Sequence, residues 1–137
     1  MRYLRALNPG VLEMIGSELR PPRGLSSVDY LEALGRMIPL PSTGLFLAIE
    51  GSEVKGWILS YSGGDETEIV QEHGEGEILE RIRGMIRQWA MANGSLRMVT
   101  KRLIGETPPM SPWKLARLVY EIPLEDEDED DNEETST

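Results

Sequence analysis

The strongest constraint on the fold is an amphipathic segment that starts at Gly76 or Glu77 and ends near Ala92. Its apolar residues recur with the spacing of one helix face. Asn93 and Gly94 follow, and glycine in this place is a common helix end. A helix with one apolar face must cover an apolar layer, so the rest of the chain has to supply one. The residues of this face are Ile78, Leu79, Ile82, Met85, Ile86, Trp89 and Ala90.

That layer is predicted directly upstream, where the pattern changes from helix to strand. Leu45 to Glu50 and Val54 to Tyr61 are short apolar runs, and Gly51-Ser52 between them is a hairpin signal. Residues 62–65 form a second turn, and Thr67 to Gln71 is a third strand. The middle of the chain therefore predicts a three-stranded antiparallel meander.

Further elements flank the meander and the long helix. We expect a strand over residues 1–6, a helix over Val11 to Leu19, and a helix from Ser26 or Ser27 to Ile38. Strands are expected at Ser95 to Lys101 and Leu115 to Leu124. The order predicts an α/β (α+β) fold, a mixed and mostly antiparallel sheet flanked by helices. The apolar face of the helix before the meander is Val28, Leu31, Leu34 and Ile38.

Charge divides the 137 residues into two parts. The formal net charge is -10, but residues 125–137 hold nine acidic side chains and no basic one. Residues 1–124 then carry 15 acids against 14 bases, close to neutrality. We predict one domain over 1–124 and a disordered acidic tail over 125–137. The tail either keeps the protein in solution or binds a protein partner as a polyanion.

Composition also excludes several classes of protein. The chain has no cysteine and one histidine, so disulfides are excluded and no metal site is expected. The longest clearly apolar run, Leu45 to Ile49, is too short to cross a membrane, and no secretory signal is visible. A nearly neutral body makes nucleic acid an improbable partner. We expect a cytoplasmic protein.

One motif joins this pattern to chemistry, the segment Gln71-Glu72-His73-Gly74-Glu75-Gly76, which follows a strand and opens the long helix. Gly74 and Gly76 allow a ligand close to the backbone. The first amides of a helix have no internal partner, and the helix dipole adds positive charge there. The segment suits a pyrophosphate; the alternative is an ordinary strand-to-helix turn.

With these elements in this order, the chain resembles the GNAT family of N-acetyltransferases, in which a Gln/Arg-x-x-Gly-x-Gly/Ala segment binds coenzyme A. The resemblance implies acetyl-CoA as cofactor, an amine acceptor, and a cleft where the strand ending at Gln71 parts from the strand beginning at Ser95. A strand amide near Val70 would polarise the thioester carbonyl. The implied cofactor-binding residues are Ile69, Val70, Gln71, His73, Gly74, Glu75, Gly76 and Glu77.

Catalytic candidates are fewer. Glu68 is a candidate general base for the acceptor amine, although it also fits a plain polar strand face. His73 is a second candidate base, or simply a solvated loop residue. The family's tyrosine-bearing helix corresponds to Gly105 to Trp113, which contains no tyrosine, so Tyr120 is the candidate general acid.

Charges around the motif favour an altered activity. Three carboxylates surround a site meant for a dianion, and Arg81 and Arg83 offset part of them. Two functions stay open. One is an acetyl-CoA-dependent N-acetyltransferase acting on an unidentified amine. The other is a catalytically inactive GNAT-like binding or assembly protein that acts through its surface and acidic tail. The carboxylates are those of Glu72, Glu75 and Glu77.

Overall fold

The computed structural model describes residues 1–101 together with 113–114, 117, 120 and 122. Its contacts divide the chain into two units, Met1–Lys101 and Arg102–Thr137, and the fold below is that of the first unit. Most of the predicted strand over Leu115 to Leu124, and all of 125–137, lie outside the described residues. The domain boundary at residue 124 therefore stays a prediction.

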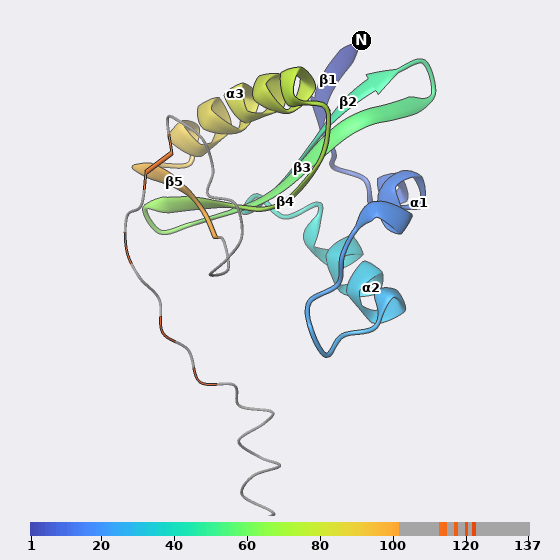
Figure 1. Cartoon of the computed structure of the whole chain (residues 1–137), viewed down its shortest axis with the longest axis horizontal. Coiled ribbons are helices and arrows are strands. Elements are labelled where there is room, and N and C mark those ends of the chain that lie inside the picture. Colours follow the sequence, from blue (N-terminus) through green and yellow to red (C-terminus); the bar gives the residue numbers. More distant parts are fainter. Residues whose placement is uncertain (102–112, 115–116, 118–119, 121, 123–137) are drawn as a thin grey trace, which may run out of the picture. The chain divides into compact units, whose positions relative to one another are not determined.

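Five strands form one sheet in the order β1-β2-β3-β4-β5 (Figure 1). The first four strands are antiparallel neighbours, and β5 pairs parallel to β4. A parallel neighbour requires a crossover, which the long helix between β4 and β5 provides. The mixed, mostly antiparallel sheet and the meander are as predicted. The strands are β1 (Arg2–Arg5), β2 (Thr43–Glu50), β3 (Glu53–Gly63), β4 (Glu66–Gly74) and β5 (Arg97–Thr100).

Helices cover both faces of the sheet. Figure 1 shows α3 (Gly76–Ala92) on one face and α1 (Leu12–Ile15) with α2 (Ser27–Met37) on the other. Alternation along β2 and β3 sends buried side chains to both layers. On the α3 face, the rings of Phe46 and Trp89 meet edge to face at 5.6 Å. The buried cluster on the α1–α2 face includes Ile15, Leu34, Ile38, Leu45, Leu47, Trp57 and Leu59.

The region before α2 differs from the single helix expected over Val11 to Leu19. A 3-10 turn η1 (Pro9–Val11), the one-turn α1 and a second 3-10 turn η2 (Gly16–Glu18) replace it. Gly16 and Ser17 have low helix propensity, and Pro21 prevents continuation, so the segment bends at each turn. Its apolar side chains are still buried at Leu12, Ile15 and Leu19.

The other helices begin and end close to the expected residues. Ser26 caps α2, because its Oγ accepts a hydrogen bond from the Asp29 amide at 3.1 Å. Val28 is an exception to the expected apolar face, since it is 74% exposed on the first turn while Tyr30 and Leu34 face the sheet. Helix α3 ends before Gly94, which takes the expected positive φ of 85°.

Candidate functional site

The junction between β4 and α3 is a single residue long. Strand β4 continues to Gly74, Glu75 is the extended N-cap, and α3 begins at Gly76. The chain turns at Gly74, whose φ of +138° is rarely adopted by residues with a side chain. A Cβ at Gly76 would meet nothing within 4 Å, so the start of α3 is open. Of the two glycines, only Gly74 is required by the backbone.

Gly74 also has a packing role that its sequence motif does not reveal. A Cβ there would lie 2.9 Å from the Cα of Gly56 and 3.2 Å from the carbonyl oxygen of Lys55. Gly56 is equally confined, since its own Cβ would lie 2.8 Å from the Ile78 side chain. This glycine pair allows β3, β4 and α3 to approach closely, whether or not a ligand binds.

The start of α3 offers backbone donors to an anion. The Glu75 carbonyl accepts the Leu79 amide at 2.9 Å, which is the first turn of the helix. The Glu75 side chain makes no capping hydrogen bond, so it does not occupy the first amides of α3. Those amides have no partner within the helix, and the helix dipole favours negative charge beside them.

The charges near this helix start are partly compensated. Arg83 donates to both oxygens of Glu72, at 3.1 and 3.3 Å, as predicted for one of the two arginines. Arg81 instead lies over the ring of Tyr3 in β1, 5.5 Å from its centroid. Glu75 and Glu77 are exposed. Two carboxylates therefore remain beside the helix start.

A β-bulge interrupts β4 at Val70. Leu59 of β3 lies opposite Gln71 while Ser60 lies opposite Ile69, so Val70 is the extra residue. On its other side, β4 pairs with β5 only from Glu66 to Ile69. Within residues 1–101, β4 has no strand partner on that side beyond Ile69. The bulge therefore lies directly after the last pair that β4 makes with β5 among the described residues, and the opening expected between these two strands stays a prediction.

Gln71 points toward the α1–α2 face and holds the segment after η2. Its Oε1 accepts the Arg20 amide at 2.9 Å, and its Nε2 donates to the Arg20 carbonyl and the Tyr30 hydroxyl, both at 2.8 Å. Burial raises the pKa of Tyr30, and the hydrogen bond from Gln71 opposes part of that rise. The Gln71 side chain thus joins residues 51 positions apart rather than facing the helix start.

The His73 side chain is held in place on the same face. Its Nε2 lies 2.9 Å from Glu18 Oε2, and its ring stacks on Trp57 at 6.1 Å between centroids. The Trp57 indole donates to the other Glu18 oxygen at 2.9 Å. No local pattern marks Glu18 in the sequence, because its partners come from β3 and β4. His73 is therefore oriented by packing and by Glu18.

Glu68 lies on the same face, two residues before the bulge. It is opposite Tyr61 in β3, and its Oε2 lies 3.5 Å from the Lys101 Nζ. Burial raises the pKa of Tyr61 to about 12, and the nearby Tyr30 and Glu68 add to the rise. Sequence reasoning missed Tyr61 and Lys101, because only strand pairing brings them to Glu68. Tyr120 belongs to the second unit and stays a prediction.

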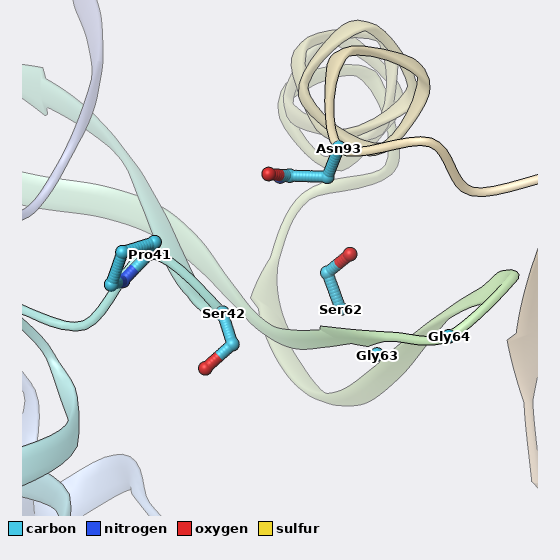
Figure 2. Close-up of a pocket in the computed structure, with 6 residues that line it drawn as sticks. All are labelled: Pro41, Ser42, Ser62, Gly63, Gly64 and Asn93. Atoms are coloured by element: carbon cyan, nitrogen blue, oxygen red, sulfur yellow. The ribbon is translucent and has the colours of Figure 1, made fainter.

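A separate hollow lies at the other end of α3. Figure 2 shows Ser62 and Asn93 among its lining residues, and Asn93 is the C-cap of α3, whose side-chain amide donates to the Trp89 carbonyl at 3.1 Å. The hollow is therefore distinct from the junction at Gly76. It is lined by Pro41, Ser42, Ser62, Gly63, Gly64 and Asn93.

Within the described ranges, no cluster of acidic and histidine side chains is arranged to hold a metal ion. No helix among the described residues is long and apolar enough to span a membrane.

Among comparisons with known proteins, the one with solved structures identifies the fold. No protein-family model and no curated protein matches the sequence. Among solved structures, an aminoglycoside N-acetyltransferase in complex with CoA superposes with a TM-score of 0.67 at 11% identity, over 89% of this chain and 93% of that one. An aminoglycoside acetyltransferase from an uncultured soil metagenomic sample, in complex with sisomicin, gives 0.57 at 12% identity, over 89% and 96%. The chain has the fold of the GNAT acetyltransferases.

Proposed function

We propose that the protein is an N-acetyltransferase that transfers the acetyl group of acetyl-CoA to an amine. The bulge at Val70, one residue beyond the last described pair of β4 with β5, carries this proposal. A bulged residue leaves the regular ladder, so a strand amide there is available as a donor. Such a donor, held rigidly, stabilises the charge that develops on a thioester carbonyl oxygen.

The same strand leads to the proposed phosphate site. We assign the pyrophosphate of CoA to the first amides of α3, at Gly76 and Glu77, and the pantetheine arm to the strand at Ile69 and Val70. Two observations support this assignment. The space around Gly76 is open, and Arg83 neutralises the nearby Glu72. A CoA complex of a protein with this fold is a further support.

On the acceptor side, we assign the general base to Glu68. Its side chain is about one-third exposed and lies near the bulge, so a water or an amine can reach it. Tyr61 beside it keeps its proton at neutral pH, because its pKa is about 12, and can donate a hydrogen bond. Tyr120 remains the candidate general acid.

Calorimetric titration with acetyl-CoA and with free CoA tests the site. Gly76→Glu places a carboxylate at the helix start, where it fits sterically and complements the helix dipole, so the fold is retained. Gly76→Ala is the matched control, since it adds a side chain without charge. We expect binding by the natural protein and Gly76→Ala, and its loss in Gly76→Glu. Equal binding by all three would refute the site.

An acceptor assay completes the test. Sisomicin is a suitable first amine, because a protein of this fold is known in complex with it. Transfer is followed by release of the free CoA thiol, with Glu68→Gln as the variant that should lose it. A cytoplasmic location and a protein partner for the acidic tail remain part of this proposal.

The exposed Glu75 and Glu77 favour a second candidate, a binding or assembly protein that has kept the fold but not the activity. Both carboxylates repel a pyrophosphate at the start of α3. The same titration separates the two functions. Absence of acetyl-CoA binding at both low and moderate ionic strength would leave the second candidate.

A further inference from the structure

A lysine amine lies beside the proposed general base. Thr100 is the last residue of β5 and pairs with Ile69, so the next residue, Lys101, follows in register toward Val70. Its Nζ lies 3.5 Å from Glu68 Oε2. The ion pair therefore lies beside the last described β4–β5 pairs and next to Val70, which is also where the proposed function places the acetyl group.

We infer that Lys101 is a site of self-acetylation, with acetyl-CoA as the donor. This inference rests on the proposed function and extends it to a substrate within the chain. An amine held beside the reacting carbon has a high effective concentration, so it competes well with amines in solution. A surface ion pair such as Lys101–Glu68 adds little stability, since the lysine side chain is 69% exposed.

The step balances without a further reactant. Glu68, directly or through a water, takes a proton from the Lys101 ammonium, and the neutral nitrogen attacks the thioester carbonyl carbon. The C–N bond forms, the C–S bond breaks, and the sulfur leaves as thiolate. The nitrogen then loses a second proton. One of the two protons ends on the CoA thiol and the other is released to solvent, which leaves an amide on Lys101.

Acetylation would also free Glu68. The amide carries no charge, so it cannot maintain the ion pair, and the carboxylate becomes available to an external amine. The first turnover therefore converts the protein from a form whose base is occupied by its own lysine into one whose base is open.

The chain contains a matched internal control. It has three lysines, at 55, 101 and 114. Lys55 also pairs with a carboxylate, Glu53, at 3.0 Å, but it precedes Gly56, which lies opposite Gly74. Gly74 is four residues along β4 from Val70, roughly 13 Å at the usual strand rise. Lys55 is therefore close to the strand end and distant from the proposed acetyl position.

The experiment incubates the full chain with acetyl-CoA and follows each lysine by peptide mass spectrometry. Rates are divided by those with acetic anhydride, which corrects for the different exposures of the amines. We expect Lys101 to react more than about tenfold faster than Lys55 on this corrected scale. The rate should be first order and independent of protein concentration. Glu68→Gln should slow Lys101 by about 10²-fold and leave Lys55 unchanged.

Four outcomes would overturn the inference. Equal corrected rates at Lys55 and Lys101 would show that acetyl-CoA in solution acetylates both lysines without catalysis. A Lys101 rate unaffected by Glu68→Gln would show the same. Acetyl-CoA binding in the calorimeter without modification of Lys101 would refute self-acetylation and leave the proposed function standing. No binding of acetyl-CoA would refute both. Thermal unfolding of each variant confirms that it is folded.

Discussion

Replacing Gly74 with alanine tests whether this glycine serves the fold rather than a ligand. At φ +138° a side chain costs about 1–3 kcal/mol. The new Cβ would also lie 2.9 Å from the Cα of Gly56 and 3.2 Å from the Lys55 carbonyl oxygen. Both neighbours are backbone atoms that cannot rotate away, so overpacking adds about 1–3 kcal/mol. We expect a loss of about 4 kcal/mol in the free energy of unfolding.

Urea unfolding followed by tryptophan fluorescence measures this loss, because Trp57 lies in the buried core. Gly76→Ala is the control two residues away. Its Cβ meets nothing within 4 Å, so its stability should stay the same or rise by up to about 1 kcal/mol. A Gly74→Ala protein within about 0.5 kcal/mol of the natural one would refute the steric argument. If it had also lost CoA binding, Gly74 would serve the ligand and not the packing.

Three further predictions concern side chains around the site. Gln71→Leu removes three hydrogen bonds to the α1–α2 region and should lower the unfolding free energy by about 1–3 kcal/mol, with faster amide exchange after η2. The raised pKa of Tyr61 means that the folded state holds its proton more tightly than the unfolded state. Its contribution to stability is therefore complete below pH 10.0 and is lost as the pH rises toward about 12, and Tyr61→Phe should make that decline shallower in pH-dependent unfolding. The pair Glu75→Gln and Glu77→Gln should raise acetyl-CoA affinity roughly fivefold at low salt, and unchanged calorimetric affinity would place the phosphates elsewhere.

Local signals in the sequence were sufficient for the elements that position the site. The unbroken apolar spacing of α3 and the Gly51-Ser52 turn predict the long helix and the hairpin, because each depends on contacts close in sequence. The segment over 11–19 was the main error. There the apolar spacing is helical, but weak helix formers and a following proline divide it into three short turns.

The geometry of the site could be predicted from the sequence only in part. The sequence predicted that Glu68, Gln71 and His73 belong to one functional region, and the structure does place them on the last strand of the meander. The sequence alone does not show which face of the sheet these side chains occupy. The bulge at Val70 changes the alternation of β4, and bulges have no reliable signal in a single sequence.

What the sequence determined by itself was the order and type of elements, the neutral body with its acidic end, and a glycine-containing junction before a helix. Only the tertiary structure determined which side chains contact one another. Gln71 meets Arg20, and His73 meets Glu18, across more than fifty residues. Lys101 reaches Glu68 because a parallel crossover returns the chain beside β4. Such contacts depend on strand register and helix packing, which arise from the whole core and not from any local run of residues.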